Sequence, residues 1–180
     1  MDDIYTTPLH TPPHWFAPSA IYMVTGATLY QQPWLDSDVK KRHFCETLFE
    51  RARILNWSIE AWAVMSNHYH FLAHAPENAI TLKSLIQGVH SISAKFVNGL
   101  DNAPGRRVWY NYWDSCITHD TSYYARLHYI HQNPVKHGYV VNAEDYPFCS
   151  YKWFLETESL EFRSLIFSQP IDQVNIKDDF

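Results

Sequence analysis

Cysteine, basic leader sequences and long apolar runs are all scarce or missing in this chain. The three cysteines, Cys45, Cys116 and Cys149, are widely spaced and form no CxxC pair. Such a set argues against a disulfide framework and against a thiolate zinc site, so we expect buried thiols. No stretch of eighteen apolar residues is present, and two acidic residues follow Met1 where a signal peptide needs basic ones. We therefore expect a soluble cytoplasmic protein with no membrane partner.

Positive charge is also limited. Lys and Arg number 14 against 19 Asp and Glu, which gives a formal net charge of −5. This balance argues against sequence-blind binding to duplex DNA, because that mode depends on neutralising many phosphates. Short basic groups occur at residues 40–42, 51–53 and 106–107. Each is interpreted first as a solvated charged face, although a local basic site stays open.

Composition divides the chain into three parts. At 180 residues, with 46% apolar content, it suits one domain with a proper core. Four prolines fall within residues 1–19, a composition that favours an extended proline-rich arm. We expect one domain over residues 20–153 and a C-terminal tail over residues 154–180. The sequence shows no internal repeat and no low-complexity stretch.

Hydrophobic periodicity predicts the elements of that domain. Strands are expected at residues 20–30, 57–65, 68–75 and 108–118, and helices at residues 37–56, 81–99 and 122–132. Pro134 is expected to end the last helix soon after residue 132. The strand at 57–65, apolar on both faces, is expected to be central. The order matches the split βαβ arrangement of ferredoxin-like folds: an α+β protein with an antiparallel βαββαβ sheet, two helices on one face, and an added C-terminal helix and tail.

Two histidines begin the strand expected at residues 68–75. His68 and His70 stand at positions i and i+2, so their side chains point to the same face of a strand. Two imidazoles placed in this way can bind one ion without bending the backbone. Taken alone, a His-x-His pair in a protein with 11 histidines can also arise by chance.

Tyr129 and Asn133 are four residues apart and share one face of the last expected helix. If this helix packs on the strand of His68 and His70, two imidazoles and an amide oxygen can hold a divalent cation beside a phenol. Such ligands suit Mg²⁺ or Mn²⁺ with open positions for phosphate oxygens better than closed tetrahedral zinc. A free phenol has a pKa near 10, so this nucleophile needs activation. Alone, Tyr129 would fit a core position and Asn133 a helix end.

The stretches at residues 61–72 and 129–140 resemble the REP-associated tyrosine transposases, which belong to the wider class of single-strand insertion-sequence transposases with a His-hydrophobic-His motif. The likeness covers about residues 20–153. It includes Val108-Trp109 and the later Asp145-Tyr146-Pro147, in matching order and spacing. The proline-rich arm, the net acidity and the C-terminal tail depart from it.

The resemblance assigns roles to individual residues. It implies that His68 and His70 bind the metal with Tyr69 in the hydrophobic slot, that Tyr129 is the nucleophile, and that Asn133 is the third ligand. It further implies cleavage of single-stranded DNA near imperfect hairpins, through a 5′-phosphotyrosine link that leaves a free 3′-hydroxyl. Residues 20–153 would then be a catalytic domain that acts at the bacterial nucleoid, as a monomer or a homodimer.

Contacts to the DNA are harder to place. Bases in single strands are commonly stacked on aromatic side chains while cations follow the backbone. We expect the first strand around Thr25, Gly26 and Thr28 to approach the bases, Gly26 being either a bulge or a point of close ligand approach. Arg106 and Arg107 are candidates because a loop arginine pair before a strand has no obvious structural role.

Three functions compete on these residues. The first is a metal-dependent tyrosine nuclease and strand transferase for hairpin-bearing single-stranded DNA. The second is a domesticated relative that binds hairpin DNA without cutting it, against which the intact His68, His70, Tyr129 and Asn133 count. The third is a metal hydrolase with an activated water, which would need more carboxylate ligands than this region offers.

Overall fold

The computed structural model describes residues 17–172 and residue 174. The expected arm of residues 1–19 therefore lies almost wholly outside the described residues. The strands are β1 (Ile21–Thr28), β2 (Ser58–Val64), β3 (His68–His74) and β4 (Trp109–Ile117). The α-helices are α1 (Asp38–Ile54), α2 (Leu82–Leu100), α3 (Asp120–Lys136), α4 (Tyr151–Thr157) and α5 (Leu160–Phe167), and short 3-10 turns lie at η1 (Leu29–Gln31), η2 (Ala79–Thr81) and η3 (Ala143–Asp145).

The four strands form one antiparallel sheet in the order β2-β3-β1-β4. This is the strand order of a ferredoxin-like fold, so the expected α+β class is confirmed. The strand expected to be central, β2, is instead at the edge. Its open side is bonded by the segment after η3: Val64 N–H donates to the Phe148 carbonyl, and Ser150 N–H donates to the Trp62 carbonyl, both at 2.9 Å. The edge is therefore covered, which explains its apolar pattern.

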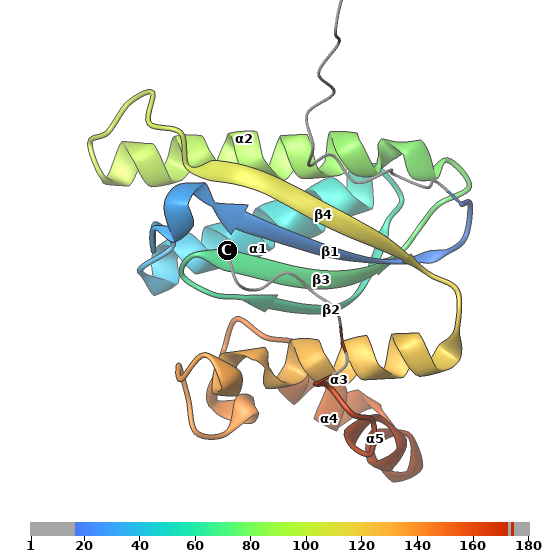
Figure 1. The fold of residues 1–180 in the computed structure, drawn as a ribbon. Coiled ribbons are helices and arrows are strands. Elements are labelled where there is room, and N and C mark those ends of the chain that lie inside the picture. Colours follow the sequence, from blue (N-terminus) through green and yellow to red (C-terminus); the bar gives the residue numbers. More distant parts are fainter. Residues whose placement is uncertain (1–16, 173, 175–180) are drawn as a thin grey trace, which may run out of the picture.

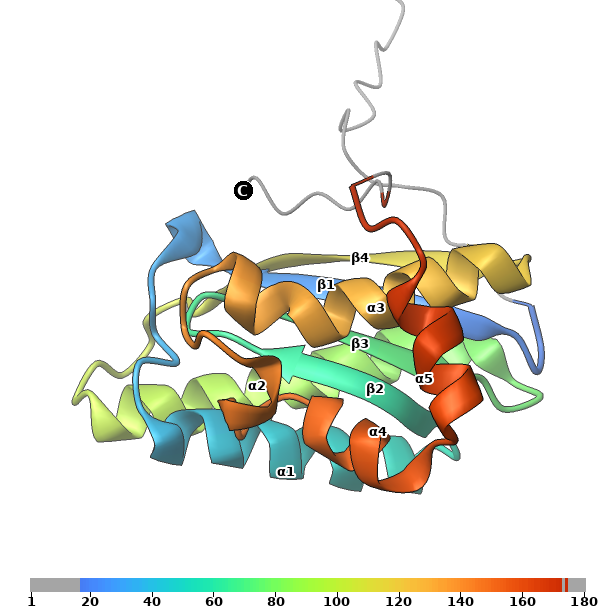
Figure 2. The same cartoon turned by 90° about the horizontal axis from the view of Figure 1, so that it is seen from below.

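Helices cover both faces of the sheet (Figure 1). The pair α1 and α2 packs on one face, where Phe44 of α1 and His90 of α2 both contact the ring of Tyr69. Helix α3 lies on the opposite face, mainly against β2, and Figure 2 shows α4 and α5 beside it. Because side chains alternate along a strand, Tyr69 points to the helix pair whereas His68 and His70 point to α3.

Gly26 is required by this packing. It pairs with Tyr69 across β1 and β3, and a Cβ at Gly26 would lie 2.4 Å from the Tyr69 ring. The glycine therefore makes room for an aromatic side chain of the core. The β-bulge expected near it is found one position later, between Ala27 and Thr28.

The basic residues at the start of α1 are not solvated. Ser37 caps the helix, and Lys40 and Lys41 are each only 5% exposed. The Lys40 ammonium lies 2.8 Å from a carboxylate oxygen of Asp36 and 2.6 Å from one of Asp101. The expectation of a charged surface is thus wrong for these two lysines, because carboxylates and the aromatic rings beside Lys41 surround them.

Helix α3 continues beyond its expected end. Pro134 lies inside the helix, which ends at Lys136. A proline has no N–H, so the Ile130 carbonyl loses its helical donor, and the Cys149 thiol lies 3.8 Å from that oxygen as a substitute. This tertiary contact explains why Asn133 is a helical residue and not part of a turn.

The described part of the expected tail packs on the domain. The boundary placed between residues 153 and 154 falls inside α4, and Phe154 and Ile166 are buried in the core. Cys45 and Cys149 are buried free thiols, as expected, while Cys116 is half-buried. No helix among residues 17–172 has both the length and the apolar character needed to cross a membrane.

Candidate active site

The two histidines of β3 form the base of a buried polar cluster between the sheet and α3. Their ring centroids are 5.2 Å apart, His68 is 4% exposed and His70 is fully buried. Burial lowers the pKa of His68 to about 3, and the neighbouring charge of His137 acts in the same direction. Burial also holds the pKa of His70 well below 6.5. Both rings are therefore neutral at pH 7, the form in which imidazole binds metals.

Each imidazole is oriented by a hydrogen-bond partner. His70 Nδ1 lies 2.7 Å from the Thr25 hydroxyl on β1, and His68 Nδ1 lies 2.7 Å from the Asn67 side-chain oxygen. An amide oxygen can only accept, so Nδ1 of His68 is the protonated nitrogen and its Nε2 presents a lone pair. Partners of this kind fix the ring and its tautomer in metal sites.

Asn133 completes the cluster from α3. Its side-chain oxygen lies 3.2 Å from His68 Nε2, so two acceptor atoms face each other across a buried gap. Among the residues that the structure describes, Asn133 Nδ2 has no hydrogen-bond partner. If hydrogen bonding alone set the amide orientation, Asn133 Nδ2 would face His68 Nε2 and donate to it. A cation bound by both residues instead requires Asn133 Oδ1 on that side. The chemistry of these donors therefore fits a hard or borderline divalent ion.

In residues 17–172, no three His, Cys, Asp or Glu side chains form a cluster that could hold a metal ion. A metal ion at His68 and His70 would therefore need a ligand of another type, and the amide of Asn133 is such a ligand. A closed structural zinc site of four thiolate or imidazole ligands does not match this set.

Tyr129 lies on the same face of α3 and beside the histidines. Its ring centroid is 5.4 Å from that of His70, with the two planes at 80°. Lys136, one helical turn past Asn133, places its ammonium 3.3 Å from the Tyr129 hydroxyl and 4.9 Å from the ring centroid. The Lys136 ammonium therefore donates a hydrogen bond to the Tyr129 hydroxyl oxygen and places a positive charge beside it.

The structure thus brings together all four residues singled out from the sequence as catalytic or metal-binding: His68, His70, Asn133 and Tyr129. Their contacts depend on the packing of α3 on β3. The site is closed in this structure, since Tyr129 is only 4% exposed and Asn133 is fully buried. Exposed Lys136 lies at its rim.

Sequence reasoning did not assign to the site Lys136 or the hydrogen-bond partners of the histidines, Thr25 and Asn67. Lys136 follows Tyr129 by seven residues, a spacing that puts both on one helix face, but Pro134 was expected to have ended the helix before it. The bond between Thr25 and His70 depends on the pairing of β1 with β3, which no local pattern specifies.

The expected DNA contacts on β1 are placed inside the protein. Thr25 is 4% exposed and holds His70, and Gly26 is buried under Tyr69. The Thr28 hydroxyl, 1% exposed, donates to the carbonyls of Gln32 and Asn67. These three residues support the site and the adjoining turn, and none of them presents a side chain on the surface.

The two candidate arginines differ. Arg106 has a structural role after all: its guanidinium bonds Asn98 Oδ1 at 2.9 Å and Asp101 Oδ2 at 2.5 Å, and it lies over the Trp34 ring. Arg107 is exposed, and its guanidinium donates to the backbone carbonyls of Trp109 and Tyr110. Contact with DNA stays a prediction for both, with Arg107 the more accessible.

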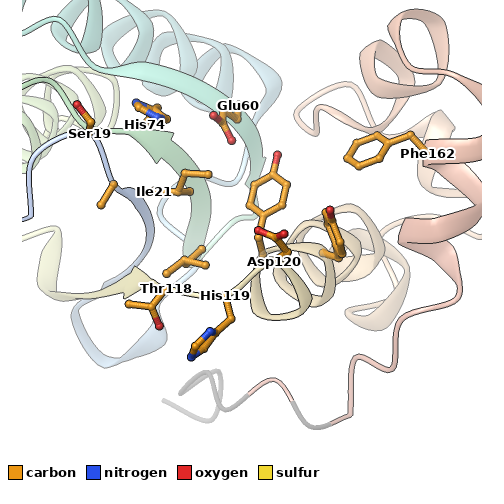
Figure 3. A pocket seen from close by; sticks show the side chains of 12 residues that line it. Ser19, Ile21, Glu60, His74, Thr118, His119, Asp120 and Phe162 are labelled. Atoms are coloured by element: carbon orange, nitrogen blue, oxygen red, sulfur yellow. The ribbon is translucent and has the colours of Figure 1, made fainter.

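A separate cavity of about 480 Å³ opens at the start of α3 (Figure 3). Glu60, His74, His119 and Asp120 line it, together with Phe162 of α5. It contains none of the four residues of the cluster, and its two carboxylates disfavour a phosphate. This cavity is therefore not part of the candidate active site.

The model of the family described as "Transposase IS200 like" matches residues 18–133, which is well over half of the chain. The chain belongs to the IS200-like transposase family. The matched region contains His68, His70, Tyr129 and Asn133, the residues of the cluster.

This IS200-like transposase is similar to two curated proteins. The REP-associated tyrosine transposase of Escherichia coli (strain K12) is 31% identical over 98 residues, which cover 53% of this chain and 54% of that protein. The putative REP-associated tyrosine transposase of Haemophilus influenzae is 29% identical over 100 residues, 51% of this chain and 57% of that protein. The chain spans about half the length of the curated relatives it matches. The resemblance noted in the sequence is confirmed.

A solved structure shares the fold. The structure of a REP-associated tyrosine transposase bound to a REP hairpin matches this transposase with a TM-score of 0.69 at 20% identity, over 96% of this chain and 95% of that one. The match extends over nearly the whole chain, so it includes the C-terminal helices that the sequence comparison left unassigned.

Proposed function

We propose that this IS200-like transposase is a metal-dependent tyrosine endonuclease and strand transferase that cleaves and rejoins single-stranded DNA beside hairpins. The observation that carries this proposal is the convergence of Tyr129 with His68, His70 and Asn133 in one buried cluster. The proposal draws on the similar proteins for the substrate, since one relative's structure contains a REP hairpin.

His68, His70 and Asn133 would hold the metal, Mg²⁺ or Mn²⁺. When bound, such an ion polarises a phosphodiester and stabilises the charge that builds up during displacement at phosphorus. Burial keeps the two imidazoles neutral, and Thr25 and Asn67 turn them toward the cluster. Both ligand histidines come from one strand and the amide comes from the helix of the nucleophile, so the same packing contact positions ligands and nucleophile.

Tyr129 would carry out the displacement. Its hydroxyl oxygen forms a bond to phosphorus while the bond from phosphorus to the 3′ oxygen breaks, so the products are a 5′-phosphotyrosine and a free 3′-hydroxyl. The phenol proton leaves to solvent and the 3′ oxygen takes one up. Lys136 holds its positive charge at the attacking oxygen. One phosphotyrosine ester forms for each phosphodiester bond that breaks. Attack by a 3′-hydroxyl on this ester can therefore rejoin the strand without ATP.

A cleavage assay tests the proposal. Labelled hairpin DNA with a single-stranded flank is incubated with the protein and Mg²⁺ or Mn²⁺, and the products are separated under denaturing conditions. We expect a covalent protein–DNA adduct that is absent with Tyr129→Phe. His68→Ala should lose cleavage but keep most of its hairpin affinity, because the metal orients one phosphate whereas recognition is spread over many contacts.

The competing functions give different results. A module that only binds hairpin DNA would show binding by the wild type and no cut at all. A metal hydrolase would cut the strand and leave no adduct, and its activity would survive Tyr129→Phe. Cleavage that survives this substitution would contradict the assignment of the nucleophile.

A further inference from the structure

Two backbone irregularities lie side by side where β1 ends, and each places an aromatic side chain at the surface. The first is the turn η1, in which Tyr30 and Gln31 both have φ of 55°. Residues other than glycine rarely adopt this left-handed conformation, and they keep it where the surroundings impose it, often at functional sites. The Thr28 hydroxyl closes the turn by donating to the Gln32 carbonyl at 2.7 Å. Burial of the Tyr30 ring does not offset this backbone strain, since the residue is 81% exposed.

The second irregularity is the β-bulge between β1 and β4. Ala27 pairs with Asn111 and Thr28 pairs with Trp109, so Tyr110 is an extra residue in β4. A bulge turns the side chain of the extra residue away from its regular direction. Accordingly Trp109 is buried in the core, whereas Tyr110 is 51% exposed.

The two tyrosines border one hollow of about 370 Å³. Its lining residues are Ala27, Thr28, Tyr30, Gln31, Tyr110 and Trp113. The ring centroids of Tyr110 and Trp113 are 6.3 Å apart, with their planes at 42°. The aromatic rings give the hollow flat apolar walls, and the side-chain amide of Gln31 is its one amide. Such a surface matches a planar heterocycle that has polar atoms on its rim.

This hollow adjoins the active site on the same face of the sheet. Trp113 pairs with Thr25, whose hydroxyl holds His70. The N–H and hydroxyl of Thr28 both bond the carbonyl of Asn67, at 2.8 and 3.0 Å, and the Asn67 side chain orients His68. Strand β1 alone separates β4 from β3, so the hollow is about 10 Å from the histidines.

A positive charge lies at the edge of the hollow. Arg107 is exposed, and its guanidinium donates to the Tyr110 carbonyl at 3.0 Å. A strand with one base in the hollow can therefore place a phosphate near Arg107 while its backbone continues toward the cluster. Aromatic stacking combined with a cation for the backbone is the usual way in which proteins hold single strands.

We propose that Tyr30, Tyr110 and Trp113 form a stacking pocket for one unpaired nucleobase of the strand that enters the active site. This inference rests on the proposed function and adds a binding subsite to it. A stacked base strengthens binding by about 5- to 150-fold with little dependence on its identity. The pocket would thus position the strand, and the sequence preference would come from other contacts.

The test compares a labelled oligothymidylate with an abasic strand of the same length, using fluorescence anisotropy and the full chain. Wild type should bind the oligothymidylate more tightly than the abasic strand. Tyr30→Asn and Tyr110→Ala should each lower that ratio by about 5- to 150-fold, with unchanged affinity for the abasic strand. Tyr30→Phe should retain the ratio. Tyr30→Asn removes the ring at a position where asparagine tolerates the left-handed backbone, so folding is preserved.

Trp153→Ala is the matched control, because Trp153 is an exposed aromatic residue on α4 (47%) and should leave the ratio unchanged. An equal affinity of wild type for the two strands would overturn the proposal, as would a ratio that survives both tyrosine substitutions. Self-association that Tyr30→Asn abolishes, with the ratio intact, would assign the pocket to a contact between copies and also overturn it. Adduct formation without base preference contradicts this inference alone, and base preference without an adduct contradicts the proposed function alone.

Discussion

Asn133 Oδ1 on α3 lies 3.2 Å from His68 Nε2 on β3, although 65 residues separate the two in the chain. These two atoms lie where the helix of Tyr129, the proposed nucleophile, meets the strand of the proposed metal-binding histidines. Any displacement of α3 along the sheet would separate Tyr129 and Asn133 from the imidazoles together. The arrangement of the four residues therefore depends on the packing of α3, in which the thiol of Cys149 contacts the Ile130 carbonyl that Pro134 leaves without a helical donor.

Removing the hydroxyl of Thr25 should weaken metal binding without weakening DNA binding. Thr25→Val keeps the shape of the side chain but leaves His70 Nδ1 without its partner at 2.7 Å. Loss of such a partner typically lowers metal affinity by about 10- to 100-fold. Mn²⁺ titration calorimetry checks this, with Thr25→Ser expected to behave as wild type. Equal Mn²⁺ affinity in the valine variant would show that this bond does not orient the ligand.

Substitution of Gly26 should destabilise the fold. Gly26→Ala places a methyl group 2.4 Å from the ring of Tyr69 in a packed core, and overpacking of this kind costs about 1–3 kcal/mol. Gly99→Ala is the control, because that position near the end of α2 has open space around it and should gain up to about 1 kcal/mol from helix propensity. Urea denaturation measures both. A neutral Gly26→Ala would mean that the Tyr69 ring moves aside freely.

Much of the fold and the cluster follows from local patterns. Alternation places His68 and His70 on one strand face, and the four-residue spacing places Tyr129 and Asn133 on one helix face. The features that sequence reasoning missed depend on contacts between distant segments. Helix α3 passes Pro134 because Cys149 replaces the missing donor. Lys40 is buried because Asp101 reaches it from the end of α2.

As the pH is lowered, the protein should begin to lose stability at a higher pH than protonation of its carboxylates alone would cause. Burial holds the pKa of His68 and of His131 at about 3 in the folded state, against 6.5 in the unfolded chain. Above pH 6.5 both states leave these rings neutral. Below pH 6.5 the unfolded chain binds protons at these rings, whereas the folded protein does not. The free energy of unfolding therefore falls toward pH 3 by about 1.4 kcal/mol per pH unit for each ring.

Urea unfolding between about pH 7.5 and 5 measures this slope. His131→Gln should reduce this slope by the contribution of one histidine, because the ring of His131 is fully buried against Ser150. A free energy of unfolding that stays level over this range would contradict the neutral, buried state of the imidazoles.

One chain should supply a complete active site. Tyr129 and His70 of the same molecule have their ring centroids 5.4 Å apart. A mixture of Tyr129→Phe and His68→Ala proteins should therefore show no more cleavage than the two proteins do separately. Recovery of cleavage in the mixture would show that α3 is exchanged between subunits.

In the proposed reaction, the phenol of Tyr129 attacks phosphorus at a site held by His68, His70 and Asn133. The most direct measurement is mass spectrometry of the protein after proteolysis, following reaction with single-stranded hairpin DNA in the presence of Mn²⁺ or of a chelator. We predict one modified peptide, with a nucleotide phosphate esterified to Tyr129, formed with Mn²⁺ and absent with the chelator. Modification of a different residue, or cleaved DNA with no modified peptide, would contradict attack by Tyr129.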